Sequence, residues 1–320
     1  TYFEIMTAVA LFYFEEYNVD MAIYEVGLGG RLDATSVVTP ILSIITSISF
    51  DHMNYLGDDI PSIAYEKGAI IRSQTPVITG NLSDEAFRVI RLIAEERNAP
   101  IYRFGEDYTV NDGDEVFVKF HEHKLVLYPQ LKGEHQKQNM SVASVAALLL
   151  QQRYPVSQTI IEEGVANCTH PGRLEELHPN LLLDCAHNEG GAQALRIFLE
   201  KRIASGRGKP ILVFGASSDK DTRKIILELS SVVSEILTTH SDHHRAIDCN
   251  VLAEELSFLP NQVLPVHSLP NLLTRIKSYL NEDQDIVCCG SIYLVGYLRP
   301  FLTELVEEHV RIDKDNKTER

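Results

Sequence analysis

Short β-branched runs alternate with helical patterns along most of this chain, and this alternation limits the folds that it can adopt. Residues 1–98 predict one series of helices and strands, and residues 181–307 predict a second. Strands that alternate with helices favour a mainly parallel sheet with helices on both faces, so the predicted fold class is α/β. Residues 101–131 contain three β-rich runs separated by turn residues, which predict a small antiparallel meander.

The periodicity also predicts where the elements lie. The expected helices cover residues 2–17, 60–71, 83–97, 135–153, 157–167, 189–203, 219–232, 248–258, 268–279 and 291–307. The expected strands outside the meander cover residues 21–26, 41–48, 76–79, 181–184, 210–214, 235–239, 263–266 and 285–289. Proline and glycine at 170–173 predict a joint. We therefore expect one domain at 1–169 and a Rossmann-like domain at 170–320, with a frayed polar tail from 311.

Charge and cysteine content exclude several kinds of protein. The chain of 320 residues has a net charge of -16, whereas a nucleic-acid surface needs a basic face. It contains no run of about 18 apolar residues, so no membrane span is expected. Its 5 cysteines form no CxxC pair, and adjacent Cys288 and Cys289 lie in an apolar run that indicates packing. These features predict a cytoplasmic protein without nucleic-acid or membrane partners.

An acidic residue precedes a glycine-rich turn near the start of the chain. Residues 23–35 read I-Y-E-V-G-L-G-G-R-L-D-A-T, which places Glu25 at the end of an expected strand. Such a turn could bind a dinucleotide or S-adenosylmethionine, but the dinucleotide fingerprint opens a helix and residues 31–40 do not predict one. The turn equally fits a tight bend that needs positive φ, with Glu25 in solvent. Both interpretations of Glu25 stay open on the residues alone.

A second expected strand ends on an acidic residue and a histidine, Asp51 and His52. A lone histidine is more often structural than a ligand. Beside a carboxylate, however, an imidazole can coordinate a metal while its neighbour fixes its orientation. Ligands bind at the carboxyl ends of strands in open α/β sheets, so Glu25 and this pair could face the same crevice.

Lys67 lies in the expected helix 60–71 and has apolar neighbours, including Ile63 and Ile71. A helical lysine is usually a solvated surface residue. The apolar neighbours instead predict that its stem is buried, and a desolvated amine can take part in chemistry.

Residues 184–188, D-C-A-H-N, connect an expected strand to an expected helix. Asn188 is a good N-cap, which leaves Asp184 and His187 for a ligand. The tract 240–244 contains three histidines and an aspartate without the ligand spacing of zinc sites, so a solvated surface loop is predicted there.

Taken together, these motifs resemble those of folylpolyglutamate synthase and dihydrofolate synthase in the Mur ligase superfamily. The matching segments run in family order over nearly the whole chain. They are E-V-G-L-G-G-R-L-D-A-T at 25–35, T-S-I-S-F-D-H at 46–52, L-G-D at 56–58, E-K-G-A-I-I at 66–71, G-E-H-Q-K-Q-N at 133–139, H-P-G-R-L-E at 170–175, D-C-A-H-N at 184–188 and G-S-I-Y-L-V-G at 290–296.

The resemblance implies an ATP-dependent amide ligase that phosphorylates a folate-type carboxylate and joins it to the amine of L-glutamate. It implies a partial P-loop-type Mur ligase central domain at 1–169, followed by the Rossmann-like ligase domain. The implied partners are small molecules, namely folate or pteroate, L-glutamate and ATP, and the implied state is a monomer.

The resemblance also implies roles for individual residues. Glu25 and His52 would ligate Mg2+, and Lys67 would be carbamylated and act with His52 in catalysis. A carbamate turns a cationic side chain into an anion with two oxygens, which a hard divalent cation prefers. The implied nucleotide contacts are Asn139, Arg173, Asp184 and His187.

The chain departs from the family pattern at several places. Ser36 replaces the family's asparagine after D-A-T, and Gly68-Ala69 inverts the usual order after Lys67. No G-x-x-x-x-G-K-[ST] phosphate loop occurs in the sequence. We therefore expect a chain that is truncated at its N-terminus, lacks its P-loop and has little ligase activity alone.

Two alternatives accompany the ligase interpretation. One is a non-catalytic binding or interaction protein that arose by loss of the P-loop, although such a protein has no physical need for Glu25, His52 and Lys67 together. The other is an S-adenosylmethionine-dependent methyltransferase built on the glycine-rich turn, which leaves Lys67 and Arg173 unexplained.

Overall fold

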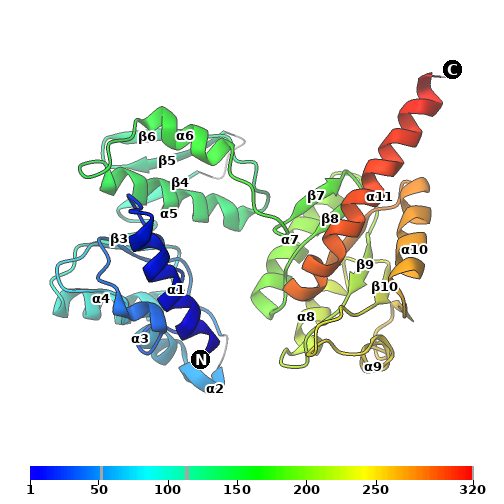
Figure 1. Ribbon diagram of the computed structural model, residues 1–320, viewed down its shortest axis with the longest axis horizontal. Coiled ribbons are helices and arrows are strands. Elements are labelled where there is room, and N and C mark those ends of the chain that lie inside the picture. The colour runs from blue at the N-terminus through cyan, green and yellow to red at the C-terminus, as the bar shows by residue number, and fades with distance from the viewer. Residues whose placement is uncertain (51–52, 112–114, 319–320) are drawn as a thin grey trace. The chain divides into compact units, whose positions relative to one another are not determined.

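A computed structural model describes the chain at residues 1–50, 53–111 and 115–318 (Figure 1). The chain divides into two compact units. The first unit comprises Thr1–Pro129 and Lys137–Asn167, and the second comprises Gln130–Gln136 and Cys168–Arg320. Both units combine helices with sheets, so the predicted α/β class is confirmed. No helix among the described residues is both long enough and apolar enough to cross a lipid bilayer.

The first part of the first unit is a three-stranded parallel sheet with helices packed against it. Its elements are α1 (Tyr2–Glu16), η1 (Ala34–Val37), β1 (Ser43–Ile45), α2 (Met53–Leu56), α3 (Ile60–Gly68), β2 (Val77–Thr79), α4 (Asp84–Glu96) and β3 (Ile101–Arg103). The core joins β1 and β2 to α3 and α4, with Ile71, Ile90 and Val77 fully buried. This core fixes the position of α3, the helix that carries Lys67.

Local sequence determines where α3 begins. The Asp59 carboxylate accepts a hydrogen bond from the Ser62 amide at 2.7 Å, and Pro61 occupies the first turn, where a missing N–H costs nothing. The helix ends at Gly68, whose hypothetical Cβ would lie 2.6 Å from Ile93 of α4. Close packing of α3 on α4 therefore requires glycine directly after Lys67.

The second part of the first unit is the predicted antiparallel meander, covered by two helices. It comprises β4 (Tyr108–Val110), β5 (Val116–Phe120), β6 (His123–Leu127), α5 (Glu134–Leu150) and α6 (Gln158–Ala166). Alternate residues of β5 and β6 point into a core that also contains Met140 and Val145 of α5 and Ile161 of α6. The meander prediction is confirmed.

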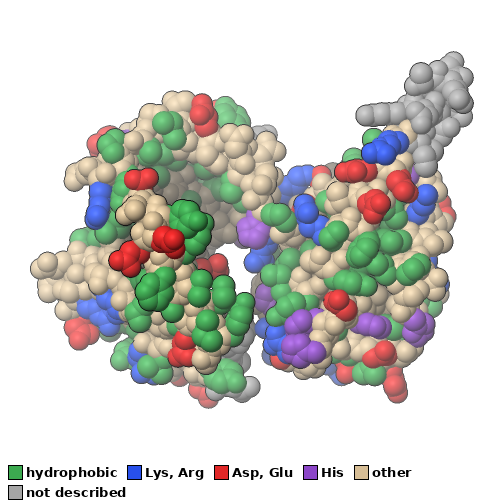
Figure 2. Space-filling model, viewed as in Figure 1, with side chains coloured by type: hydrophobic (Ala, Val, Ile, Leu, Met, Phe, Trp, Pro, Cys, Tyr) green, Lys and Arg blue, Asp and Glu red, His purple; other side chains and the backbone are tan. Residues whose placement is uncertain are grey.

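Two expectations for the first unit are wrong within the described residues. Residues 21–26 form no strand, and Ile23 is 87% exposed, because no described strand offers them a hydrogen-bonding ladder. The apolar pattern of α1 predicts a buried face, yet only Thr7 of this helix is buried. Figure 2 shows apolar side chains gathered over it. Periodicity specifies an apolar stripe, but burial needs a second element to cover that stripe.

The second unit is a six-stranded sheet with helices on both faces. Its elements are β7 (Glu175–His178), β8 (Leu181–Leu183), α7 (Glu189–Ala204), β9 (Ile211–Phe214), α8 (Thr222–Leu229), β10 (Glu235–Thr238), α9 (Cys249–Glu255), β11 (Gln262–Pro265), α10 (Leu269–Asn281), β12 (Ile286–Cys289) and α11 (Ile292–Thr318). The strand order is β11-β10-β9-β12-β8-β7, and all pairs except β7 with β8 are parallel.

Alternation along the strands separates two cores. Leu182, Leu212 and Val287 point to the face covered by α7, α8 and α9, whereas Leu183 and Val213 point to the face covered by α10 and α11 (Figure 1). Strand β12 supplies Cys289 to the first core and Cys288 to the second, and both are fully buried. Packing is therefore the role of this cysteine pair, as predicted.

Several boundaries of the second unit differ from the expected ones. Strand β7 is not predicted from the sequence, because E-E-L-H at 175–178 has neither β-branched residues nor strict alternation. Helix α8 begins only at Thr222, where Asp221 caps it. Helix α11 continues through Thr318 despite Pro300, beyond the expected end at 307.

Candidate functional site

In the first unit, the glycine-rich turn lies directly against the C-terminal turn of α3. The Arg31 amide donates to the Glu66 carbonyl at 3.0 Å, and the Arg31 guanidinium pairs with the Glu66 carboxylate at 2.9 Å. A Cβ on Gly30 would lie 2.9 Å from the Glu66 carbonyl oxygen and 3.2 Å from that of Lys67. Only glycine permits this approach, so the structure brings the turn after Glu25 to the backbone of Lys67.

Asp33 holds the turn together, a role that the sequence analysis does not assign to it. One carboxylate oxygen accepts from the Gly27 and Leu28 amides at 3.0 and 2.9 Å, and the other accepts from the Thr35 amide at 2.9 Å. Burial alone would raise the pKa of Asp33, but hydrogen bonds from Thr35, Leu28 and Gly27 outweigh it and lower the pKa below the ordinary 3.8. The D-A-T sequence, typical of an Asx turn, is the signal for this role.

Replacing Asp33 by alanine should lower the free energy of unfolding by about 1–2 kcal/mol at neutral pH, because several amides lose their acceptor in a half-exposed site. Since folding lowers the pKa of Asp33, its stabilisation is present above the unfolded value near 3.8 and is lost as the pH falls through the folded value. Urea titrations of wild type and Asp33→Ala at pH 7 and pH 3 should show the difference shrinking in acid. A constant difference would contradict this assignment.

The structure describes two of the three predicted metal-site residues, Glu25 and Lys67, but not His52. Glu25 is exposed, and Lys67 is half-buried in the last turn of α3, next to buried Ile63 and Ala64. Among the described residues, the Lys67 ammonium forms no ion pair. His52 and its neighbour Asp51 lie outside the described residues. Whether the three side chains meet at one ion stays a prediction.

In the second unit, three strand ends surround Asp184. The Asp184 amide donates to the Cys288 carbonyl at 3.0 Å, and the Gly290 amide donates to the Ala186 carbonyl at 2.9 Å. The loops after β9 and β12 also approach each other, with the Ser217 and Ser291 hydroxyl oxygens 3.5 Å apart. Helices α8 and α11, which follow β9 and β12, cover opposite faces. Ligands of open α/β sheets bind at such a reversal.

Asp184 is buried, with only 7% of its surface exposed, and both of its carboxylate oxygens accept backbone hydrogen bonds. The Leu174 amide donates to one and the Ala186 amide to the other, both at 2.9 Å. Burial raises the pKa of Asp184, and these two hydrogen bonds together with nearby Arg173 and His187 only partly offset it. Asp184 therefore ties the loop 172–174 to the end of β8.

Arg173 and His187 both lie close enough to Asp184 to act on its charge, so the structure brings these three predicted residues together. Arg173 is exposed, and His187 is half-buried. The His187 Nδ1 atom donates to the Cys185 carbonyl at 2.8 Å, which leaves Nε2 as the acceptor of a neutral ring. Asn188 caps α7 by accepting from the Gly191 amide at 2.8 Å, as predicted.

His135 is a further residue at this site that the sequence analysis leaves without a role. Burial and the charge of Arg173 lower its pKa, which places the two side chains near each other. A Cβ on Gly133 would lie 2.7 Å from the His135 ring and 2.8 Å from Leu174, so the segment packs closely on the loop that carries Arg173. The predicted nucleotide contact Asn139 lies exposed in α5.

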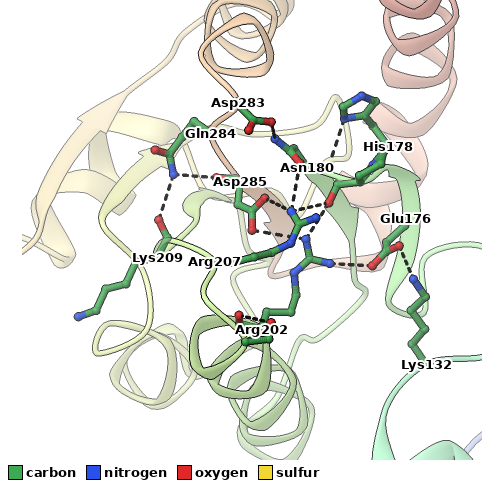
Figure 3. A network of polar contacts seen from close by, with 12 residues as sticks. Lys132, Glu176, His178, Asn180, Arg202, Arg207, Lys209, Asp283, Gln284 and Asp285 are labelled. Atoms are coloured by element: carbon green, nitrogen blue, oxygen red, sulfur yellow. Dashed lines mark hydrogen bonds and ion pairs between the residues drawn. The ribbon is translucent and has the colours of Figure 1, made fainter.

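A dense ionic network of the second unit lies at the opposite end of its parallel strands from Asp184. Arg202 pairs with Glu176 at 2.7 Å, and Asp285 pairs with Arg207 at 2.6 Å (Figure 3). Lys132 completes the network through Glu176. Asp285 precedes β12, at the amino ends of the parallel strands. The network therefore connects structural segments and stands apart from Asp184.

Comparison with known proteins assigns both parts of the chain to one family. Residues 1–147 match the family model of the Mur ligase middle domain, and residues 172–292 match that of the Mur ligase, glutamate ligase domain. The chain is therefore a Mur ligase, which confirms the predicted combination of a central α/β domain with a Rossmann-like one.

Individual relatives define the family further. The chain is 34% identical to the dihydrofolate synthase/folylpolyglutamate synthase of Bacillus subtilis (strain 168), over 93% of this chain and 71% of that protein. It is 31% identical to the Escherichia coli (strain K12) protein of the same name, over 93% of this chain and 68% of that one.

Solved structures show the same fold. Mycobacterium tuberculosis folylpolyglutamate synthase complexed with ADP and AMPPCP superimposes with a TM-score of 0.83 at 30% identity, over 93% of this chain and 72% of that one. Escherichia coli FolC in complex with DHPP and ADP gives 0.81 at 29% identity, over 94% and 71%. The chain belongs to the dihydrofolate synthase/folylpolyglutamate synthase family of the Mur ligases.

Proposed function

We propose that this ligase uses ATP to join L-glutamate to a folate-type carboxylate, through an acyl phosphate that the glutamate amine attacks. The observation that carries the proposal is the close packing of the glycine-rich turn on α3, which positions the backbone of Lys67 next to the segment that follows Glu25. In this proposal residues 1–169 are the ATPase domain without its P-loop and residues 170–320 the ligase domain. No observation favours the non-catalytic or methyltransferase alternatives.

The donor set of the turn fits a hard divalent cation. Glu25 offers an exposed carboxylate, and Lys67 after carbamylation would offer two oxygens on a long arm. His52 would supply the third ligand. When bound, Mg2+ would supply charge stabilisation to the transferring phosphoryl group. The protein's contribution is orientation, because Asp33 and the Arg31–Glu66 pair fix the turn against α3.

The residues around Asp184 are proposed to hold the nucleotide, with Asn139 as a further contact. Arg173 presents an exposed guanidinium on a loop that Asp184 fixes, which suits phosphate oxygens. His187 has a defined tautomer and can accept a hydrogen bond through Nε2. The relatives' complexes with ADP support nucleotide binding by this family.

The proposed setting is the cytoplasm, where the enzyme would act as a monomer on small molecules. All five cysteines are free, and four are buried, which fits a reducing compartment.

The test of the function is ADP release by a form of the protein that carries a phosphate loop, because this chain alone is expected to have little ligase activity. Release should require ATP, Mg2+, L-glutamate and either dihydropteroate or tetrahydrofolate, and mass spectrometry should show one added glutamyl residue. Two results would argue against the proposal: ADP release that does not depend on L-glutamate, and nucleotide binding by that form without any glutamylated product.

Replacing Arg173 by alanine should raise the KM for ATP about 10- to 100-fold, because one charge-assisted contact to phosphate is lost. The side chain is exposed, so thermal stability should change little. Arg91→Ala is the matched control, since Arg91 forms an exposed pair with Glu95 on α4. An unchanged KM in Arg173→Ala would remove Arg173 from the nucleotide site.

A further inference from the structure

Four potential metal ligands gather at the carboxyl ends of β10 and β11 in the second unit. His240 follows β10, Asp248 and Cys249 begin α9, and His267 follows β11. Figure 2 shows histidine side chains along this edge of the unit. The ligase site around Asp184 does not use any of the four residues.

Three of these side chains, those of His240, Asp248 and Cys249, lie close enough to share one ion. One ligand atom each from His240, Asp248 and Cys249 lie within 4.8 Å of one another. The Cys249 sulfur lies 3.4 Å from Nδ1 of His267, about the edge length of a tetrahedral zinc site with Zn–S near 2.3 Å and Zn–N near 2.0 Å. The His267 ring would have to turn toward the other three ligand atoms to complete the tetrahedron.

His240 supplies an independent indication of a ligand. Its Nδ1 atom is buried and has no hydrogen-bond partner among the described residues. Buried polar atoms are nearly always satisfied by protein, by water or by an ion. Asp248, in contrast, is exposed and already caps α9 through Oδ1, which accepts from the Asn250 amide at 2.8 Å.

Backbone contacts hold the elements of this cluster in place. The Thr238 hydroxyl donates to the Cys249 carbonyl at 2.8 Å, which fixes the start of α9 on β10. The Val266 amide donates to the Thr238 carbonyl at 2.8 Å, and the Thr239 hydroxyl donates to the Val266 carbonyl at 3.3 Å. These bonds position His240 and His267 on adjacent strand ends, as a preorganised metal site requires.

We propose that His240, Asp248 and Cys249 bind one structural zinc ion, with His267 beside the thiol as the fourth ligand. Sulfur with imidazole and carboxylate donors selects zinc over magnesium or calcium. On binding, the Cys249 thiol loses its proton to solvent and the thiolate coordinates the ion. The ion would join β10, α9 and β11. The simpler alternative is a thiol–imidazole hydrogen bond between Cys249 and His267 without metal.

The sequence conceals this site. The tract 240–244 predicts a solvated loop, and within it only His240 belongs to the cluster. The other ligands come from 248–249 and 267, and none forms a short zinc-finger spacing.

The experiment is metal binding by the purified chain after chelator treatment. Zinc titrated against a chromogenic chelator should bind with one equivalent per chain. Substitution by Co2+ should give the absorption of a tetrahedral complex and a thiolate-to-cobalt charge-transfer band. Cys249→Ser and His240→Ala should each weaken zinc binding more than about 100-fold. Removing a residue that only hydrogen-bonds to a metal ligand already lowers affinity up to about 100-fold, and removing the ligand itself should cost at least as much.

Matched controls separate this site from chance binding. Cys168→Ser and His244→Ala change an exposed cysteine and an exposed histidine outside the cluster, and both should bind zinc like wild type. Circular dichroism should show that all four variants fold. No zinc uptake, a cobalt complex without the thiolate band, or equal affinity in Cys249→Ser and wild type would each overturn the proposal in favour of the thiol–imidazole hydrogen bond.

Discussion

Replacing Lys67 by alanine should lower glutamate-dependent ADP release at least about 100-fold in an active preparation of this ligase. The proposed carbamate is an anionic group that helps to hold Mg2+ near the transferring phosphoryl group. Removing one preorganised electrostatic group of this kind costs about 100- to 1,000-fold in turnover. The fold should survive, because Lys67 is only half-buried and makes no ion pair within the described part of the chain.

Two further measurements make the Lys67 result specific. Alanine leaves a space that acetate or another short carboxylate can enter, so added carboxylate should restore part of the rate. Lys124→Ala, at an exposed position of β6, is the matched control and should keep wild-type turnover. Wild-type turnover by Lys67→Ala, or a high-resolution map of the Mg2+-bound enzyme with an unmodified amine in solvent, would falsify the assignment.

Helices of this fold were predictable where a capping residue in the sequence marks the start of the helix. Asp59 and Asn188 each cap the helix that the pattern places after them. The segment 21–26 has an equally apolar pattern but forms no strand, because a strand depends on a neighbour that local sequence does not encode. For the same reason, sequence could not predict that β12 lies between β9 and β8.

In the candidate site too, local sequence predicts individual residues but not the contacts that hold them. The sequence indicated Asp184 by its position at a strand end and Lys67 by its apolar neighbours, whereas Arg173 was indicated by the family resemblance. The supporting contacts were not visible, because each joins segments distant along the chain. The Arg31 amide donates to the Glu66 carbonyl, and the Leu174 amide donates to the Asp184 carboxylate 10 positions further along the chain. His135 was missed because its neighbour Arg173 lies on another loop.

Replacing Asp184 by alanine should strongly lower the stability of the second unit. Two buried amides, those of Leu174 and Ala186, would lose their acceptor, which costs about 2–5 kcal/mol in the free energy of unfolding. The loop that carries Arg173 would also be released, so ATP binding should weaken along with stability. Asp184→Asn should cost less, because one amide oxygen still accepts.

The pH dependence of this effect follows from the burial of Asp184. Folding raises its pKa above the ordinary 3.8, so its contribution is fully present below the unfolded value and declines as the pH rises through the folded value. Urea titrations followed by tyrosine fluorescence should therefore show the stability difference between wild type and Asp184→Ala shrinking from acid towards neutral pH and then levelling. Asp242→Ala, at an exposed position, is the control and should show no such trend. A difference that grows with pH would mean that the charged carboxylate, rather than its hydrogen-bonding geometry, stabilises the loop.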